Sequence, residues 1–288
     1  MKVWLCCILT SKPQLIPVMT TELLQELHAP FSLTKEQVDF FQLNGFIKLK
    51  QVLSSALLQH INEVITTEVA KQHTERIALE ERDTYGKAFL QVMNLWTKSA
   101  AVKEIVFSKR LARIAAELMQ VTGVRMYHDQ ALFKEPGGGF TPWHADQYYW
   151  PLSTDKTVTV WIPLQKIELD MGPLEFSAKS QCLEEGRTLR ISDDSEVVIQ
   201  QKLTLKDFEK IVEPFDLGEI SYHMGWVFHR AGPNTTDQMR KVMTIIYMDK
   251  EMTLMEPKNN NQVADWEAWC PGAEIGKVIN TPLNPVLY

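Results

Sequence analysis

The spacing of apolar residues predicts helices in the first third of the chain. Apolar side chains recur every three or four positions over residues 54–72, and again over 111–119, so each segment carries one apolar stripe. Thr34 and Gln37 have the spacing of a capping box, and Gly45 follows as a helix stop, which predicts a short helix over residues 34–44. Residues 46–49 then alternate between apolar and polar, as a strand does.

After Gly123 the period changes to two. Short segments rich in β-branched and aromatic residues follow one another, separated by Gly, Pro, Asn or Asp. A short helix opened by Thr204, at about residues 204–212, is expected to interrupt them. Many short strands without regular intervening helices indicate an antiparallel sandwich or barrel, so the fold is expected to be mostly β with flanking α-helices. The expected strands cover residues 125–134, 157–162, 197–201, 219–223 and 241–248.

Composition limits the partners of this chain. With 288 residues, 45% of them hydrophobic, the chain is long enough to bury a full core as one domain. A net charge of −6 argues against a nucleic-acid backbone or an anionic membrane surface as the main partner. No run of 18 apolar residues exists, so no membrane span is expected.

The four cysteines show no spacing typical of a zinc ribbon or a disulfide framework. A reducing compartment, and so a cytoplasmic location, is therefore expected. The apolar run Val3 to Leu9 after Lys2 resembles a short signal peptide, which leaves a targeting segment as the weaker alternative. No small-x-small cleavage site follows that run before Pro17.

Three residues could share one metal ion. In a strand, His144 and Asp146 would project from the same face roughly 6–7 Å apart, although such a pair alone also arises by chance. His229 is a third candidate far along the chain. Two His and one carboxylate form the facial triad that leaves open positions on non-haem Fe(II), as oxygen chemistry requires, whereas a closed zinc site would use four protein ligands.

Arg240 could hold a dicarboxylate cosubstrate beside that ion. It lies eleven residues after His229, across a turn at Pro233 and Asn234, so its strand can return alongside. A guanidinium can bind one carboxylate with two hydrogen bonds while the far end of the molecule chelates iron. The alternative is an ordinary surface arginine.

Several segments, in this order, resemble the phytanoyl-CoA dioxygenase family of Fe(II)- and 2-oxoglutarate-dependent oxygenases. The similarity covers about residues 32–288, including a C-terminal Thr-Pro-Leu-Asn-Pro stretch at 281–285. It implies a double-stranded β-helix, the jelly roll of cupin-like proteins, with an N-terminal helical buttress. The segments are Asp129-Gln130 to Phe133-Lys134, Trp143 to Asp146, Gly218-Glu219 to His229, Gly232 to Asn234, and Arg240.

The resemblance also implies a division of the chain and a set of roles. Residues 1–31 would be a possibly flexible extension, and 32–288 a single oxygenase domain with a buttress at 32–123, a jelly-roll core at 124–250 and a C-terminal segment at 251–288. His144, Asp146 and His229 would bind Fe(II), and Arg240 would anchor the far carboxylate of 2-oxoglutarate. Gln130, Trp161 and Asn94 would contact this cosubstrate.

The activity implied is hydroxylation of a C–H bond of a small organic or lipid-like substrate, using O2 and releasing succinate and CO2. Halogenating relatives have a small residue at the position of Asp146, so the carboxylate favours hydroxylation. Two departures stand out. Ala231 replaces the Ser that often helps the Arg hold 2-oxoglutarate, so either another group such as Thr159 or Thr244 supplies the hydroxyl or 2-oxoglutarate binds more weakly. Residues 178–180 replace a usual Gly-Ser-His stretch.

Substrate contacts are less defined. An aromatic wall of Tyr148, Tyr149, Trp150 and Trp226 could surround an apolar or ring-bearing substrate, or these residues could simply pack the core. His128 shares strand parity with Gln130, and His223 precedes His229 by six residues, so either could reach the pocket.

Two rival functions remain open beside the oxygenase. One is a non-oxidative, cupin-like metal enzyme that uses the same three ligands but has no role for Arg240. The other is a catalytically lapsed jelly-roll binding protein. The oxygenase is expected to act on a small molecule as a monomer or homodimer.

Overall fold

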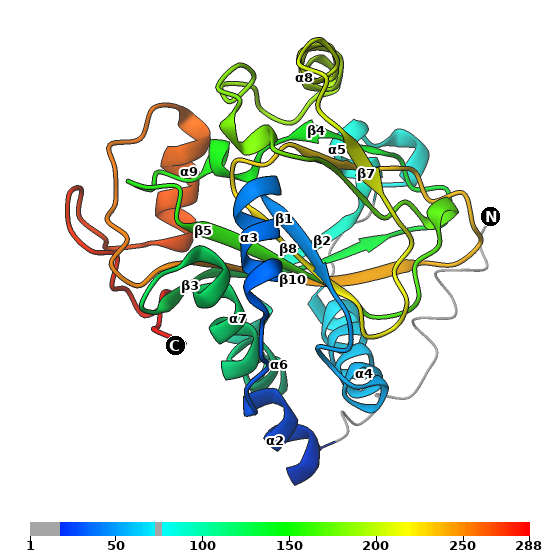
Figure 1. Cartoon of the computed structure of the whole chain (residues 1–288). Helices are drawn as coiled ribbons and strands as arrows, with labels where there is room; N and C mark the ends of the chain where they lie inside the picture. Colours follow the sequence, from blue (N-terminus) through cyan, green and yellow to red (C-terminus); the bar gives the residue numbers. More distant parts are fainter. Residues whose placement is uncertain (1–17, 73–76) are drawn as a thin grey trace.

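Two antiparallel sheets face each other at the centre of the protein (Figure 1), in a computed structural model that describes residues 18–72 and 77–288. The six-stranded sheet has the order β1-β8-β5-β10-β3-β2, and the four-stranded sheet has the order β4-β9-β6-β7. This arrangement agrees with the expected mostly β jelly roll. The strands are β1 (Phe46–Leu49), β2 (Leu90–Met93), β3 (Val124–Lys134), β4 (Thr141–His144), β5 (Thr157–Pro163), β6 (Leu174–Ser177), β7 (Lys210–Val212), β8 (Ile220–Met224), β9 (His229–Ala231) and β10 (Arg240–Asp249).

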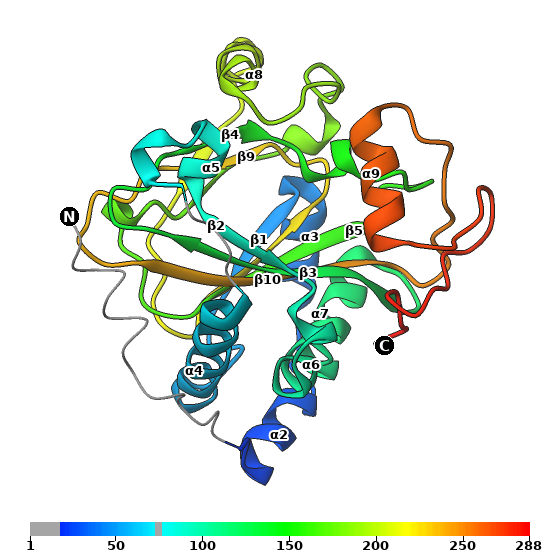
Figure 2. The ribbon, with the colours of Figure 1, turned by 180° about the vertical axis from the view of Figure 1, so that it is seen from behind.

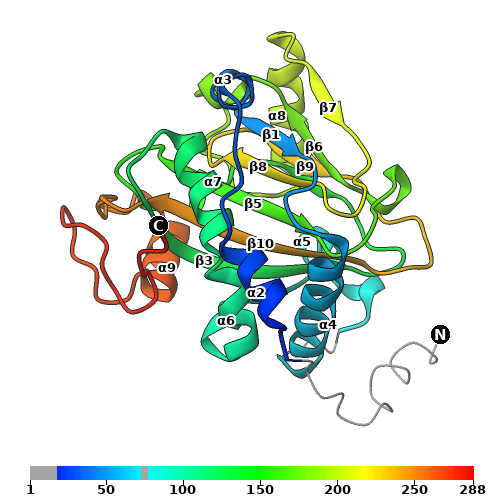
Figure 3. The same ribbon diagram turned by 60° about the horizontal axis from the view of Figure 1, so that its bottom comes forward.

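Helices cover the outer face of the six-stranded sheet (Figures 1 and 2). Figure 3 shows α7 lying beneath the middle of this sheet, where it contacts β3, β5 and β10. The α-helices are α2 (Thr21–His28), α3 (Lys35–Asn44), α4 (Ser55–Gln72), α5 (Thr84–Ala88), α6 (Ala100–Val106), α7 (Lys109–Met119), α8 (Asp193–Leu205) and α9 (Asn260–Trp269). Short 3-10 helices are η1 (Leu79–Glu81), η2 (Leu95–Thr97), η3 (Asp146–Tyr149), η4 (Leu169–Met171) and η5 (Ser180–Cys182).

The apolar stripes predicted from the sequence bury the helices on the sheet. Leu111, Ile114 and Leu118 of α7 are fully buried in the same cluster as the outward residues of β5 and β10. The predicted helix at 34–44 is confirmed as α3, with the Thr34–Gln37 capping box in place and Gly45 in the left-handed conformation. The main core therefore lies between the helices and the six-stranded sheet, outside the jelly roll.

The inner face of the six-stranded sheet carries polar side chains in rows. Residues directly opposite each other in an antiparallel pair share one face. One row runs across four strands as His128, Ile246, Thr159 and His223, and the next as Gln130, Thr244, Trp161 and Ser221. The same alternation that buries apolar residues outward thus directs a polar set inward.

The four-stranded sheet supplies a matching inner face. His144 pairs with His229, which pairs in turn with Phe176, and a second row runs as Thr141, Ala231 and Leu174. The two sheets therefore bring histidines and hydroxyl groups towards the space between them.

Two predicted elements were wrong. The strand expected at residues 197–201 lies inside α8, and the helix expected at 204–212 is the end of α8 followed by β7. Ser192 and Ser195 form a capping box, and three acidic residues in the first turn favour the helix dipole, so the helix begins at Asp193. The adjacent valines at 197 and 198 suggested a strand, but Ile199 and Leu203 are the residues that α8 buries.

The predicted N-terminal extension contains one packed helix. Leu27 of α2 is buried, and its carbonyl accepts a hydrogen bond of 2.7 Å from Ser108 Oγ at the start of α7. The signal-like run and Cys6 and Cys7 lie outside the described residues. Over the described part of the chain, no helix is both long and apolar enough to cross a membrane.

Asn284 fastens the C-terminal segment to the sheet. Its Nδ2 donates to the carbonyls of Met126, Tyr127 and Trp269 at 3.1–3.2 Å, and its Oδ1 accepts from Thr281 Oγ1 at 2.6 Å. Asn284 is fully buried, so these bonds connect the tail, β3 and the end of α9 without water.

Asn284→Ala is therefore expected to destabilise the protein by about 2 kcal/mol, because it leaves buried carbonyl groups without donors. Chemical denaturation would measure the change. Asn260→Ala, at an exposed position in the first turn of α9, serves as the control and should stay within about 0.5 kcal/mol of the unmodified chain. Equal effects of the two substitutions would contradict this role of Asn284.

Candidate functional site

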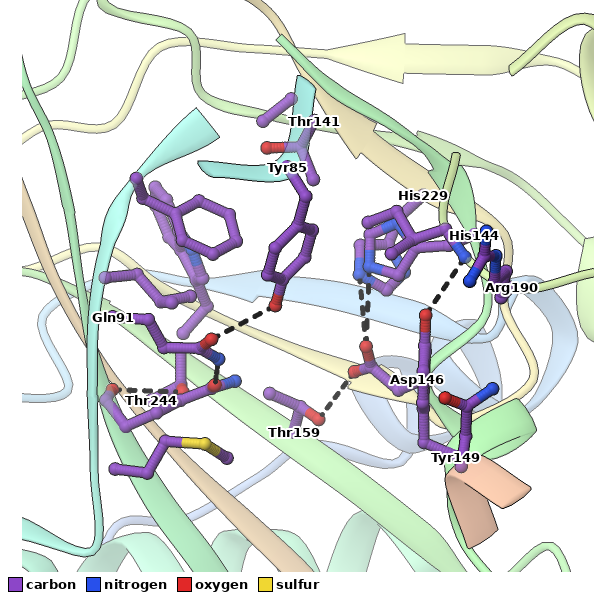
Figure 4. A pocket seen from close by; sticks show the side chains of 18 of the residues that line it. Tyr85, Gln91, Thr141, His144, Asp146, Tyr149, Thr159, Arg190, His229 and Thr244 are labelled. Carbon is purple, nitrogen blue, oxygen red and sulfur yellow. Dashed lines mark hydrogen bonds and ion pairs between the residues drawn. The ribbon is translucent and has the colours of Figure 1, made fainter. Parts of the chain in front are cut away.

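A cavity of about 660 Å³ opens between the two sheets. Its walls are the inward residues of both sheets, together with parts of α5, α9 and the start of α8. Figure 4 shows His144, Asp146 and His229 on one side of it, with Tyr85 and Gln91 on the other. A pocket of this size suits a small-molecule site.

The structure brings His144, Asp146 and His229 together. One ligand atom from each residue lies within 4.8 Å of the others. The Nε2 atoms of His144 and His229 are 3.5 and 3.7 Å from Asp146 Oδ1. His144 ends β4, Asp146 begins η3 and His229 begins β9, so the site lies where two paired strands meet a short turn.

Backbone carbonyls orient both imidazoles. His144 Nδ1 lies 2.8 Å from the carbonyl of Pro142, and His229 Nδ1 lies 3.1 Å from that of Val227. An Nδ1–H that donates to a carbonyl leaves Nε2 with its lone pair, which is the form that binds a metal. Both histidines therefore present Nε2, the nitrogen free to bind a metal in this tautomer, on the side of Asp146.

The second carboxylate oxygen of Asp146 also has hydrogen-bonding partners. Oδ2 accepts from Thr159 Oγ1 at 3.1 Å and lies 3.2 Å from His223 Nε2. These partners stand side by side on β5 and β8, in the row described above. Asp146 thus spans the two sheets, with Oδ1 on the side of His144 and His229 (Figure 4).

The electrostatics of the three residues suit a cation. Although burial opposes it, the neighbouring His229, His144 and His223 hold the pKa of Asp146 well below its usual range. Burial, together with His144 and His223, places the pKa of His229 well below its usual range, so its imidazole is neutral. One carboxylate and two imidazoles are the donor set of the facial triad, which fits Fe(II) and leaves positions open for other ligands.

Arg240 is a buried cation without a countercharge at one end of the cavity. Its side chain is 1% exposed, and among residues 18–72 and 77–288 no carboxylate forms an ion pair with it. One terminal nitrogen donates to the carbonyl of Gly172 at 2.5 Å, while Nε has no partner in the described structure. Burial lowers the pKa of Arg240 to about 9. An unpaired buried charge is unfavourable, so this end of the cavity fits an anion.

Lys134 is buried next to Arg240. It lies opposite Arg240 in the register of β3 and β10, and its Nζ donates to the carbonyls of Gly139 and Gly232 at 2.6 and 2.7 Å. Burial, together with Arg240, lowers the pKa of Lys134 to about 6. The backbone here is closely packed, because a Cβ on Gly172 would lie 2.2 Å from the carbonyl oxygen of Gly232.

Of the three residues expected to contact the cosubstrate beside Arg240, two line the cavity and one does not. Gln130 and Trp161 line the cavity, and the Trp161 ring lies 5.6 Å from the Arg240 guanidinium carbon. Asn94 is not among the cavity-lining residues, and its Oδ1 accepts from the Asp129 N–H at 3.4 Å. The Asn94 side chain therefore supports β3 through its hydrogen bond with the backbone of Asp129.

The candidate substrate residues divide between two cavities. Tyr149, Trp150, His128 and His223 line the central one. Tyr148 and Trp226 line a separate cavity of about 580 Å³, to which Trp150 also contributes. The expected aromatic wall thus includes only part of the predicted set.

The sequence analysis missed the contribution of α9. Asn261, Asp265 and Trp269 all line the central cavity, and the Trp269 ring packs at a tilt against His128 with ring centroids 5.1 Å apart. Their four-residue spacing, which places them on one helix face, was the signal available in the sequence. Tyr85, Gln91, Thr141 and Arg190 also line the cavity and were not predicted.

Comparisons with known proteins agree with this geometry. The family model described as phytanoyl-CoA dioxygenase matches residues 41–242. A 2-aminoethylphosphonate dioxygenase from the uncultured bacterium HF130_AEPn_1 is 25% identical over 219 residues, which cover 74% of this chain and 81% of that protein.

Solved structures show the same fold. The α-ketoglutarate-dependent carbocyclase SnoK from nogalamycin biosynthesis has a TM-score of 0.72 at 21% identity, covering 90% of this chain and 99% of its own. The epimerase SnoN, in complex with Fe3+, α-ketoglutarate and nogalamycin RO, has a TM-score of 0.74 at 17% identity, covering 88% of this chain and 98% of its own.

Asp146→Ala is expected to weaken Fe(II) binding roughly 100-fold or more, because it removes the charged member of the donor set. His223→Ala should weaken it about tenfold, since His223 only holds Asp146 in position. Anaerobic calorimetric titration would measure both, with His28→Ala on α2 as the control that leaves the affinity unchanged. Unaltered binding by Asp146→Ala would remove Asp146 from the metal site.

Asp265 makes the stability of the metal-free protein depend on pH. Burial raises the pKa of Asp265 to about 7, although hydrogen bonds from Tyr127, at 3.0 Å, and Trp269 oppose the shift. The folded state then holds a proton that the unfolded state releases near pH 4, so stability falls as pH rises from about 4 to about 7.

Between pH 5 and 8 the unmodified chain should therefore lose about 2–3 kcal/mol of stability relative to Asp265→Asn. Denaturation at several pH values would test this difference. The exposed Asp155→Asn should follow the unmodified chain at every pH. A constant difference between the unmodified chain and Asp265→Asn would show that Asp265 titrates normally.

Proposed function

The chain belongs to the phytanoyl-CoA dioxygenase family, and we propose that it hydroxylates a C–H bond of a small organic substrate as an Fe(II)- and 2-oxoglutarate-dependent dioxygenase. Succinate and CO2 are the accompanying products. The observation that carries this proposal is a two-His, one-carboxylate group in the same cavity as a buried arginine without a countercharge. A non-oxidative metal enzyme would have no use for that arginine.

Different residues would bind the iron and the cosubstrate. His144, Asp146 and His229 would hold the iron, and Arg240 would hold the far carboxylate of 2-oxoglutarate. When bound, iron and 2-oxoglutarate together activate O2 and supply the oxidising power for the substrate C–H bond. The protein contributes the fixed orientation of the groups that it binds.

Hydrogen bonds to the three metal-binding side chains determine how rigidly these side chains are held. The carbonyls of Pro142 and Val227 fix the rotation of the two imidazoles, and Thr159 and His223 fix Asp146. Because Asp146 supplies a carboxylate ligand, no coordination position is vacated for a halide. This arrangement favours hydroxylation over halogenation.

The register of β3 and β10 separates a cosubstrate end from a substrate end. Arg240 lies opposite Lys134, and Ile246 lies opposite His128 six residues further along β10. Six residues of strand correspond to about 20 Å. With 2-oxoglutarate extending from Arg240 towards the metal, the substrate would occupy the space near His128, Trp150 and Trp269.

The charges at the substrate end favour a neutral or cationic substrate. Asp193 and Asp265 line the cavity outside the cosubstrate end, against the single guanidinium of Arg190 among the described lining residues there. An acyl-CoA thioester, which carries several phosphate charges, fits such a wall poorly. A substrate screen that detects succinate release should therefore begin with amines and uncharged ring compounds, and include 2-aminoethylphosphonate because of the relative named above.

We also propose the domain, the cellular location and the oligomeric state in which this activity occurs. Residues 32–288 would form one oxygenase domain, acting in the cytoplasm as a monomer or homodimer. The net charge of −6 supports a function without a nucleic-acid partner.

Anaerobic titration with Fe(II) and then 2-oxoglutarate tests the proposed function. The complex is expected to show the visible metal-to-ligand charge-transfer band of an iron-bound 2-oxo acid. Arg240→Ala should weaken 2-oxoglutarate binding roughly 100-fold, because it removes a charge-assisted bidentate contact. Arg190→Ala, a second cavity-lining arginine, should leave this affinity unchanged and is the matched control.

The alternatives give different results in the same titration. Iron binding without the band would contradict the oxygenase and favour the non-oxidative metal enzyme. Absence of iron binding would favour the lapsed binding protein.

A further inference from the structure

Asp265 of α9 is a carboxyl group without a countercharge at the substrate end of the central cavity. It lines the cavity and is partly buried. Its Oδ2 accepts from Tyr127 Oη at 3.0 Å, and no cation among residues 18–72 and 77–288 forms an ion pair with it. A carboxylate left unpaired in such surroundings is unfavourable, and a cationic group of a ligand would supply the missing charge.

His128 presents an unsatisfied nitrogen at the same end. It is 4% exposed and lines the cavity, yet its Nδ1 has no hydrogen-bond partner in the described part of the chain. Its ring packs against Trp269, which follows Asp265 by four residues on the same face of α9. Buried polar atoms are nearly always hydrogen-bonded in native proteins, so His128 points to a polar group of a ligand.

A β-bulge in β3 turns Tyr127 and His128 towards α9 together. Ile246 pairs with His128, and the next residue of β10 pairs with Met126, so Tyr127 is left without a partner in the register. Tyr127 lies in one buried cluster with the inward Ile246, and its hydroxyl reaches Asp265. An extra residue of this kind redirects side chains, often next to an active site. Two consecutive residues of β3 therefore serve the same wall of the cavity.

Aromatic rings and the lack of a nearby cation make this wall suitable for an organic cation. Tyr149, Trp150 and Trp269 line the cavity, and aromatic faces attract ammonium groups. Arg190, the arginine that lines the cavity outside the cosubstrate end in the described structure, is exposed and forms no ion pair with Asp265. A neutral substrate would leave both Asp265 and His128 Nδ1 unsatisfied.

The strand order limits the size of such a ligand. His128 and Thr159 lie in one inward row, separated by Ile246 on β10. Neighbouring strands are about 4.8 Å apart, so two spacings amount to about 10 Å. Thr159 donates to Asp146 of the metal site. A group bound at His128 therefore lies about one small molecule's length from the metal-binding residues.

We propose that the substrate is a small primary amine, whose ammonium group donates hydrogen bonds to the Asp265 carboxylate and to His128 Nδ1. This inference rests on the proposed function and names the substrate class of that site. An ammonium group has three N–H donors, so it can satisfy both acceptors at once. Asp265 and His128 would then determine substrate specificity at the end of the cavity opposite Arg240.

Matched amines and alcohols of one carbon skeleton test this preference. The probes are 2-phenylethylamine, cyclohexylmethylamine and butylamine, each beside its alcohol, titrated by anaerobic calorimetry into the protein loaded with Fe(II) and 2-oxoglutarate. At least one amine should bind roughly tenfold or more tightly than its alcohol. Its N-trimethylated form, which keeps the charge but has no N–H donor, should bind more weakly than the primary amine.

Three variants locate the preference. Asp265→Asn should reduce the ratio of amine to alcohol affinity to within about threefold, because it removes the charge. His128→Phe keeps a ring against Trp269 but removes the nitrogen, and it should weaken amine binding about threefold to tenfold. Glu267→Gln is the matched control, since Glu267 is an exposed acid of the same helix that does not line the cavity. It should leave the ratio unchanged.

Proton release gives a second readout of a direct contact. Burial raises the pKa of Asp265 to about 7, so the ligand-free carboxyl group holds a proton at pH 6 that a bound ammonium would displace. Calorimetry in buffers of different ionisation enthalpy should detect close to one proton released per amine at pH 6, and almost none at pH 8. Asp265→Asn should release none at either pH.

The neighbours of Asp265 do not titrate in this range. Burial raises the pKa of Tyr149 and of the Cys270 thiol to about 12, and it lowers the pKa of His128 to about 4. Burial also holds the pKa of Tyr127 well above its usual range. The remaining charged groups towards this side are the Asp146 carboxylate, whose pKa is well below its usual range, and the Arg190 guanidinium.

The outcomes separate this inference from the proposed function. If the iron and 2-oxoglutarate complex shows its charge-transfer band but prefers no amine of the panel to its alcohol, the inference is overturned while the proposed function stands. A preference that persists in Asp265→Asn, equal binding of the trimethylated form, or no proton release at pH 6 would also overturn it. If no band forms, the proposed function fails and the inference fails with it.

Discussion

Alternation of side chains along β3, β5, β8 and β10 gives one sheet two opposite faces. Its outward residues bury apolar surface against α4 and α7, which is the largest core of the molecule. Its inward residues, such as His128, Thr159 and His223, are polar and meet the histidines of the other sheet. Because α4 and α7 pack only on the outward face, the inner face can hold polar groups that would otherwise disrupt this core. A shift of one residue in register would reverse both faces, so fold and site depend on the same pairing.

Charge is distributed unevenly along the cavity. At one end Arg240 is buried without a countercharge among the described residues, and at the other end the Asp265 carboxyl group stands beside Tyr127 and aromatic rings. Neither end neutralises the other, because the metal-binding residues and a length of strand lie between them. Such a polarised cavity stabilises ligands whose charges are complementary at each end, and it disfavours their entry in the reverse orientation.

The sequence predicted best those features that depend on neighbours in the chain. The α3 helix followed from its capping box, and the candidate metal pair from the two-residue spacing of His144 and Asp146. The pairing of strands that are distant in the sequence could not be predicted, so the pairing of Thr141 with Ala231 is known only from the structure. The failure at α8 has a local cause, since two adjacent valines favour a strand while the serine capping box, which decides the matter, was not recognised. The proposed roles of Arg240 and of the metal ligands came from the resemblance together with spacing, and the structure adds their hydrogen-bonding partners.

The contacts of Asn284 connect two walls of the central cavity. One side chain joins the carbonyls of Met126 and Tyr127, beside His128, to the carbonyl of Trp269 at the end of α9. The tail therefore sets the separation between the two walls of the substrate end, while the metal ligands and Arg240 lie on strands it does not hold. Residues 281–288 thus brace two walls of the cavity against each other, because the same segment bonds the backbone of β3 and the end of α9.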